Sequence, residues 1–321
     1  MRKTSTDKII VGLDIGTTKV CAIVGKMNEN GKINVLGMGK SSSMGGVSRG
    51  MVTNISKTVS AIQAAVEIAS RQSKIEIARV YVGIAGHHIH SKQFTKTVIR
   101  ANNHEEIRPE ELRRMEQEMH NIYLGHDLEI IHILPQEYKV DGEPDIKDPA
   151  GMTGMRLEGS YHVITGQTTA AKNIIMAVEK AGLEVDGLVV EPVASARAVL
   201  SEEEMEGGVA LVDIGGGTSD IAIFHNGIIR HTAVVPYGGD IITNDIREAF
   251  QLGKEQAEAL KVKCGSAIAE ESRRNQIQSI QDFPGRKPKE ISVYNLSLVI
   301  NARATEIIHQ IYDQMTCASF V

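Results

Sequence analysis

The chain has 321 residues, and at roughly 150 residues per domain this length predicts about two domains. Hydrophobic residues make up 42% of the chain and charged residues 23%, which excludes a wholly disordered protein. The formal net charge of -5 argues against a nucleic acid partner held by general electrostatic attraction. The 3 cysteines lie far apart, which favours a reducing compartment, and no apolar run is long enough to span a bilayer. We therefore expect a cytoplasmic protein.

Apolar runs between turn residues predict strands, and apolar residues at helical spacing predict helices. Before residue 86 the predicted strands cover residues 9–13, 20–24, 33–36 and 80–85, and one helix covers residues 54–69. After residue 160 the predicted strands cover residues 161–165, 188–190, 209–212, 221–224 and 228–235. The predicted helices of this part cover residues 169–181, 193–200, 254–266 and 300–312, and the acidic residues 202–208 are predicted to form a loop.

The stretch from about residue 87 to residue 156 is more polar and rich in histidine. It predicts a helix over residues 110–122, strands over 130–134 and 138–140, and a loop over 144–149. We interpret it as an inserted α+β subdomain. Its first histidines, His87, His88 and His90, suggest a metal site, but no Cys or carboxylate stands at ligand spacing. The alternative, an exposed loop and strand edge, is favoured.

The sequence Asp-Ile-Gly occurs twice, each time between two apolar runs. Residues 14–16 correspond to residues 213–215 at a constant offset of 199 positions. Both copies predict a strand, a short turn, a second strand, another turn and a third strand. Because of this internal repeat, we expect the two domains to be two duplicated α/β lobes.

Each of the two turns carries groups that suit phosphate oxygens. Glycines expose backbone N–H groups and permit close approach, threonine hydroxyls can donate, and a lysine adds a positive charge. The predicted phosphate contacts are Gly16, Thr17, Thr18, Lys19, Gly215, Gly216, Gly217 and Thr218. A carboxylate repels phosphate, so Asp14 and Asp213 are expected to hold Mg²⁺ through water. The alternative for either turn alone is a tight hairpin without a ligand.

The segments 12-GLDIGTTKV-20 and 211-LVDIGGGTSDIAIF-224 resemble the two phosphate motifs of the actin, Hsp70 and sugar-kinase ATPase superfamily. The resemblance implies ATP with Mg²⁺ as the ligand, and catalytic roles for Asp14, Asp213 and Glu191. Glu191 opens a segment similar to the helix that connects the two lobes, and the resemblance assigns it the positioning of the attacking water. Its alternative is a carboxylate at the start of a helix, before Pro192.

Within the predicted helix 254–266, three residues are similar to superfamily positions that contact the base and the ribose: Glu258, Lys261 and Lys263. The alternative for these side chains is a solvated helix face.

Within this superfamily the chain is most similar to the FtsA family of bacterial cell-division proteins. The likeness covers residues from about 8 to 310 and is carried by 80-VYVGIAGHHIHS-91, 149-PAGMTGMRLEG-159 and 182-GLEVDGLVVEPVASARAVL-200. It implies an actin-like α/β fold of two duplicated lobes with the inserted subdomain in the first lobe. The expected domains are a first-lobe core (1–85), the insertion (86–160), a return with the connecting helix (161–200), and an incomplete second lobe (201–321).

The same resemblance implies partners. Members polymerise into filaments and link the FtsZ ring to the cytoplasmic membrane, so the chain is expected to be at most a slow ATPase in an adaptor role. The insertion would contact the next protomer and later division proteins. The FtsZ carboxy-terminal tail would bind residues 245–290. The basic residues within 286–289 either contact this acidic tail or form a surface loop without a partner role. Alternatives on the same fold are a small-molecule kinase and a chaperone-like ATPase.

The end of the sequence lacks two features of the family. No glycine follows Gly285, so the Gly-Gly turn that holds adenosine is expected to be missing, as is the amphipathic membrane helix beyond it. We interpret the chain as truncated, and we expect membrane attachment to depend on the missing helix.

Overall fold

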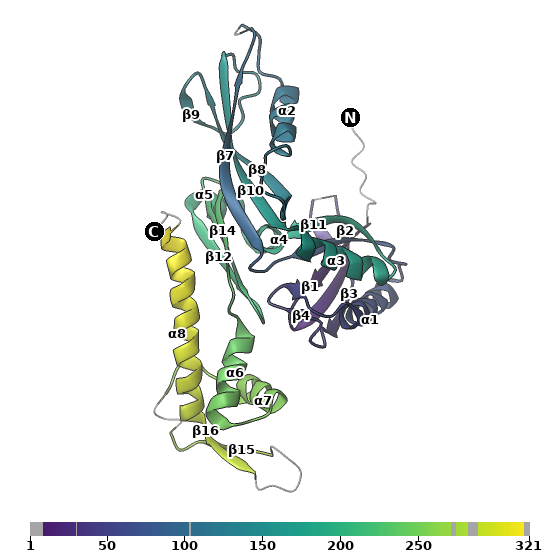
Figure 1. Ribbon diagram of the computed structural model, residues 1–321, viewed down its shortest axis with the longest axis vertical. Helices are drawn as coiled ribbons and strands as arrows, with labels where there is room; N and C mark the ends of the chain where they lie inside the picture. Colours follow the sequence, from purple (N-terminus) through teal and green to yellow (C-terminus); the bar gives the residue numbers. More distant parts are fainter. Residues whose placement is uncertain (1–8, 30, 103, 271–273, 282–287, 318–321) are drawn as a thin grey trace. The chain divides into compact units, whose positions relative to one another are not determined.

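The computed structural model describes residues 9–29, 31–102, 104–270, 274–281 and 288–317. It divides into two compact units (Figure 1). The first unit contains residues Met1–Asp213 and Asp220–Val234, and the second contains Ile214–Ser219 and Val235–Val321. Each unit is described separately below.

The first unit is built on a five-stranded sheet in the order β11-β6-β1-β2-β3. Its strands are β1 (Ile9–Ile15), β2 (Lys19–Met27), β3 (Ile33–Ser42), β6 (Arg79–Ile84) and β11 (Glu184–Val190). The first three form the predicted antiparallel meander, while β6 runs parallel to β1 and to β11. Two short strands, β4 (Val47–Ser48) and β5 (Met51–Val52), form a separate pair.

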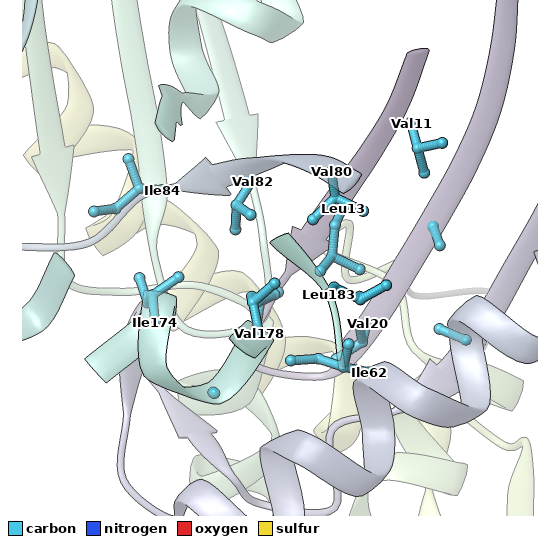
Figure 2. Packing of buried hydrophobic residues seen from close by; sticks show 14 of the residues in the cluster. Val11, Leu13, Val20, Ile62, Val80, Val82, Ile84, Ile174, Val178 and Leu183 are labelled. Atoms are coloured by element: carbon cyan, nitrogen blue, oxygen red, sulfur yellow. The ribbon is translucent and has the colours of Figure 1, made fainter. Parts of the chain in front are cut away.

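One face of this sheet is buried by two helices, α1 (Ile55–Ser73) and α3 (Thr168–Lys180) (Figure 2). Alternation along β1 sends Val11 and Leu13 into this core and leaves Asp14 on the opposite face. The Asn54 side chain accepts a hydrogen bond from the Lys57 amide and caps the start of α1. Both predicted helices are confirmed.

Strand β3 and helix α1 approach each other so closely that the contact requires glycine. A Cβ added at Gly39 would overlap the Ala65 carbonyl oxygen and lie 2.7 Å from the Ala69 nitrogen. Both are backbone atoms of α1, so the clash is not relieved by a side-chain rotation.

The insertion forms a four-stranded sheet in the order β7-β10-β8-β9, covered by α2 (Pro109–Met119). Its strands are β7 (Ile89–Ile99), β8 (Leu128–Val140), β9 (Glu143–Ile146) and β10 (Arg156–Gln167). The two strands predicted over residues 130–140 are one strand, because a register shift near Pro135 lets the pairing with β10 continue past the proline. The predicted loop over residues 144–149 was wrong at its start, which belongs to β9, and the sequence analysis missed β7.

The inserted sheet is hydrogen-bonded to strand β14 (Ile228–Val235) of the same unit. Gln136 donates to the Ile229 carbonyl, and Ser91 donates to the Thr232 carbonyl over 3.2 Å. The Arg230 guanidinium also pairs with Glu137 at 3.2 Å. These contacts join the insertion to the rest of the unit through polar groups as well as through apolar packing.

Two helices precede the second copy of the repeat. Helix α4 (Glu191–Val199) begins directly after β11, and α5 (Glu202–Gly207) follows it. The prediction of a loop over residues 202–208 was therefore wrong, because Ser201 and Glu204 form a reciprocal capping box that starts a short helix. The second meander consists of β12 (Val209–Ile214), β13 (Ser219–His225) and β14, in the sheet order β12-β13-β14.

The second unit contains α6 (Gly239–Phe250), α7 (Lys254–Cys264) and α8 (Val293–Cys317), with a two-stranded sheet of β15 (Ile277–Ile280) and β16 (Lys289–Ser292). Leu260 and Leu296 lie in its core. The Arg303 guanidinium of α8 donates to both Asp245 oxygens of α6. Among the described residues, no helix is long and apolar enough to cross a membrane.

We expect Gly39→Ala to destabilise the chain by about 1–3 kcal/mol, because the added methyl group must push α1 away from β3. Gly12→Ala is the matched control, since a Cβ at Gly12 meets nothing within 4 Å. Urea denaturation of both variants measures the difference. Equal stabilities of the two variants would show that the close approach of α1 to β3 is not a constraint.

Candidate functional site

The two predicted turns have the same backbone closure. The Gly16 amide donates to the Lys19 carbonyl over 2.9 Å, and the Gly215 amide donates to the Thr218 carbonyl over 2.9 Å. These residues correspond at the offset of 199 positions found in the sequence. The repeat is therefore present in the backbone, at the turns β1–β2 and β12–β13.

The buried residue Ser43 is hydrogen-bonded to the backbone of the first turn. Its hydroxyl donates to the Gly16 carbonyl over 2.6 Å, and its amide donates to the Thr18 carbonyl over 3.2 Å. Within the described part of the chain, no hydrogen bond occupies the backbone N–H groups of Thr17 and Thr18. The turn therefore has backbone N–H groups available for an anionic ligand, while its Gly16 and Thr18 carbonyl groups accept hydrogen bonds from Ser43.

The second turn is anchored within the second unit. The Gly239 amide donates to the Gly215 carbonyl over 2.9 Å, and the Asp240 amide donates to the Gly216 carbonyl over 2.8 Å. A Cβ at Gly238 would lie 2.5 Å from the Gly215 carbonyl oxygen. The residue before α6 therefore lies so close to the turn that only glycine fits there. The N-terminus of α6 is thus fixed beside the predicted phosphate-binding residues Gly215 and Gly216.

Carboxylates gather in the first unit where β1, β11 and β12 end. Burial raises the pKa of Asp14, the Lys19 ammonium lowers it, and Asp213 raises it again. Burial also raises the pKa of Glu191, to about 8, with further increases from Asp14, Asp220 and Asp213 and an opposing effect from Lys19. The structure thus brings together the predicted residues Asp14, Lys19, Glu191 and Asp213.

Asp220 belongs to this cluster and was missed by the sequence analysis. It is buried near the start of β13 and raises the pKa of Glu191. The available signal was the second aspartate of the motif, seven positions after Asp213 in 213-DIGGGTSD-220. The repeat does not mark this position, because the first copy has Cys21 in place of Asp220.

Glu191 is placed by the local backbone. It is the first residue of α4, directly after the last residue of β11, and Pro192 follows in the first turn of the helix. Its carboxylate lies against β6, where a Cβ at Gly83 would come within 3.2 Å of Oε1. Both interpretations of Glu191, water activation and a helix-start carboxylate, are compatible with this position.

The cluster has the charge balance of a cation site. Asp14, Asp213 and Asp220 raise the pKa of Glu191, Asp213 raises that of Asp14, and Lys19 is the positive charge that acts on both Asp14 and Glu191. A divalent cation would offset the repulsion that adds to the effect of burial on the pKa values of Asp14 and Glu191. Within the described ranges, no three His, Cys, Asp or Glu side chains are grouped as direct metal ligands. Mg²⁺, which retains much of its hydration shell, would suit the charge balance of Asp14, Lys19 and Glu191.

In the second unit, two of the three predicted base- and ribose-contacting residues, Glu258 and Lys261, form a polar network between α7 and α6. The Lys261 ammonium donates to the Gly239 carbonyl over 3.0 Å and to the Thr243 hydroxyl over 2.8 Å, and it pairs with Glu258 at 2.7 Å. Although burial raises the pKa of Glu258, hydrogen bonds from Lys261 and Thr243 bring it below its usual value. Glu258 and Lys261 are half-buried, whereas Lys263 is exposed. The network lies next to Gly239, which is bonded to the second turn.

The expectation that His88 lies on an exposed loop or strand edge was wrong. His88 is fully buried in the turn before β7, its pKa is lowered to about 4 by burial, and neither ring nitrogen has a partner among the described groups. The Arg49 carbonyl oxygen and the His88 ring both lie close to Gly86, so the chain around Arg49 covers this turn.

The predicted FtsZ-binding segment maps to α6, α7, β15 and β16 of the second unit. Residues 282–287, including Arg286 and Lys287, lie outside the described residues. Lys289 donates to the Phe250 and Gln251 carbonyls at the end of α6, and Asp245 is paired with Arg303. These two side chains are therefore engaged within the unit.

Comparisons with known proteins agree on the class of protein. A family model described as "Cell division protein FtsA" matches residues 210–317, and one described as "SHS2 domain inserted in FTSA" matches residues 86–165. The fold is similar to that of a solved "PilM-PilN type IV pilus biogenesis complex", with a TM-score of 0.64 and 16% identity over 94% of this chain and 75% of that chain. MreB5 of Spiroplasma citri bound to ADP gives a TM-score of 0.54 and 15% identity over 96% of this chain and 79% of that chain. The fold is that of the actin-like ATPases, as predicted.

A relative from Pseudomonas aeruginosa, described as "Cell division protein FtsA", is 40% identical over 307 residues, which are 96% of this chain and 73% of that protein. The chain belongs to the FtsA family, and its role is in cell division. The family match for residues 86–165 also confirms an inserted subdomain in the first lobe.

We expect the contribution of Glu191 to the stability of the ligand-free chain to fall as pH rises from about 5 to 8. A Glu191 pKa raised from 4.5 to about 8 means that the folded chain holds a proton that the unfolded chain releases. Glu191 alone should therefore lower the unfolding free energy by up to about 1.4 kcal/mol per pH unit, while buried histidines such as His88, whose pKa is lowered, act in the opposite direction below about pH 6.5. Glu191→Gln should remove this dependence and stabilise the chain at pH 7.5 more than at pH 5.5.

Urea denaturation at the two pH values provides the measurement. Glu179→Gln serves as the matched control because Glu179 is exposed on α3. If Glu191→Gln keeps the wild-type pH slope, Glu191 does not carry the buried proton.

Proposed function

We propose that the chain binds ATP with Mg²⁺ through the two turns, polymerises, and links the FtsZ ring to the cytoplasmic membrane. The observation that carries this proposal is that Asp14, Asp213 and Asp220 all act on Glu191, with Lys19 opposing them, beside a turn with available N–H groups. Such a cluster is costly without a cation, and a nucleotide polyphosphate with its Mg²⁺ supplies charges of both signs. Membership of the FtsA family and the actin-like fold support the same ligand.

Each turn has a defined part in this proposal. Thr17, Thr18 and Lys19 would contact phosphate oxygens from the first turn, and Gly216, Gly217 and Thr218 from the second. Asp14 and Asp213 would hold the hydration shell of Mg²⁺, which neutralises phosphate charge when bound. Glu258 and Lys261 would lie on the nucleoside side, because their network is bonded to Gly239 next to the second turn.

Glu191 is the proposed general base. With a pKa of about 8 it is mostly protonated at pH 7 in the ligand-free chain and accepts no proton from water. Positive charge near Asp14 and Asp213 would lower this pKa and free the carboxylate to orient and deprotonate the attacking water. Glu191 would therefore act as a base only while the ligand is bound. This dependence fits a slow ATPase that serves assembly.

The proposed partners follow from the FtsA family. The FtsZ carboxy-terminal tail would bind the second unit between Asp245 and Glu290, and the inserted subdomain would contact the next protomer and later division proteins. Lys289 and Asp245 already have partners within the unit, so they contribute to this surface mainly by shaping it. Attachment at the cytoplasmic face of the membrane is proposed only through the carboxy-terminal amphipathic helix that the family resemblance implies.

We expect Lys19→Gln to weaken ATP binding about 10-fold in the presence of Mg²⁺, because a charge-assisted phosphate contact is lost. Omission of Mg²⁺ should weaken wild-type binding as well. Titration calorimetry with ATP gives both values. Lys57→Gln, at an exposed position on α1, controls for the change in net charge. Equal affinities of the two lysine variants would remove Lys19 from the site.

Assembly can be tested by sedimentation of the full chain. We expect the chain to pellet with Mg²⁺ and ATP and to remain in the supernatant without nucleotide, and a labelled FtsZ tail peptide to show increased fluorescence anisotropy with the chain. Lys19→Gln should need more ATP to pellet but should bind the peptide normally. No sedimentation and no peptide binding under any condition would falsify the adaptor role.

A further inference from the structure

A histidine of the inserted subdomain contacts the backbone that carries Glu191. The Val190 amide donates to His132 Nε2 over 3.1 Å. His132 lies in β8, and Val190 is both the last residue of β11 and the residue before the first turn of α4. Because Nε2 accepts this hydrogen bond, the neutral ring carries its proton on Nδ1.

The contact is made where the chain changes from strand to helix. Val190 has extended dihedral angles, φ -67° and ψ 124°, and its side chain does not cap α4. The direction of the Glu191 side chain depends on how the chain turns at this junction. A hydrogen bond to the Val190 amide therefore fixes the backbone one residue before the proposed base.

The other side of Glu191 is also restricted. A Cβ at Gly83 would lie 3.2 Å from Glu191 Oε1 and 3.3 Å from its Cγ, so the side chain rests against the β6 backbone. Gly83 and Val189 are partners in the parallel pairing of β6 with β11. His132 and Gly83 thus constrain the same short segment from two different strands.

Strand β8 is well anchored where His132 lies. Ile131 and Leu134, on either side of His132, pack against the core cluster of the five-stranded sheet. Strands β8 and β11 are also in contact (Figure 1). Burial lowers the pKa of His132, so the ring is a neutral acceptor near pH 7.

We propose that His132 is a positioning residue for Glu191, through which the inserted subdomain holds the general base in place for ATP hydrolysis. This inference rests on the proposed ATPase function. It deepens that function, because a residue of the partner-binding subdomain would support the chemical step without contacting ATP. A small displacement of a base can cost orders of magnitude in rate.

The test uses two variants of His132. His132→Leu removes the acceptor, whereas His132→Gln retains an oxygen that can accept from the Val190 amide. We expect His132→Leu to lower kcat for ATP at least 10-fold with ATP affinity changed less than about 2-fold, and His132→Gln to recover kcat to within about 3-fold of wild type. His104→Leu, at an exposed position of the insertion, should leave both constants unchanged.

Two kinetic outcomes would overturn the inference. One is a wild-type kcat in His132→Leu, and the other is a parallel loss of kcat and ATP affinity that His132→Gln does not rescue. The second outcome would indicate a general structural role, and thermal unfolding of each variant would show the matching loss of stability.

A measurement without nucleotide separates this inference from the proposed function. Carbon-13 NMR of the Glu191 side chain follows its carboxyl titration in the ligand-free chain. We expect His132→Leu to shift the titration midpoint and His132→Gln to leave it near the wild-type value. Absence of ATP binding and turnover in the wild-type chain would overturn the proposed function, whereas an unchanged midpoint in His132→Leu would overturn the positioning role.

Discussion

Repulsion among carboxylates at one end of the first unit is the constraint that organises the site. Asp14, Asp213 and Asp220 all raise the pKa of Glu191, and Lys19 alone opposes them there. Such a cluster costs stability at Glu191, because burial and the neighbouring carboxylates both disfavour its charged form. The proposed ligand would bring the positive charge that offsets this cost.

The sheet makes this cluster possible by separating its two faces. Along β1, alternate residues enter the core beneath α1 and α3, which leaves Asp14 on the other face close to Cys21 of β2. The glycines of β3 let α1 approach closely and keep that core dense. The buried face therefore supplies the stability, and the strand ends can hold groups that reduce it.

The parts of the site that could be predicted from the sequence are those that depend on local pattern. Residues 14–16 and 213–215 were found because the repeat preserves both their spacing and their turn chemistry. The acidic composition of α5 predicted a loop, but a capping box at its start forms a helix. Strand β8 was predicted as two strands, but a bulge in its pairing with β10 lets it continue as one. His132 could not be found from the sequence, since the contact with Val190 joins residues 58 positions apart and depends on how two sheets meet.

This last contact changes how the insertion relates to the rest of the first unit. A subdomain joined only by its two chain crossings would be free to move without affecting the site. Here Ile131 and Leu134 pack against the core of the five-stranded sheet, Gln136 is bonded to β14, and His132 is bonded to the residue before α4. Since one strand makes all of these contacts, a force on β8 is transmitted to the segment that carries Glu191. Coupling of this kind is reciprocal, so a ligand that fixes Glu191 would also stabilise β8 in its place.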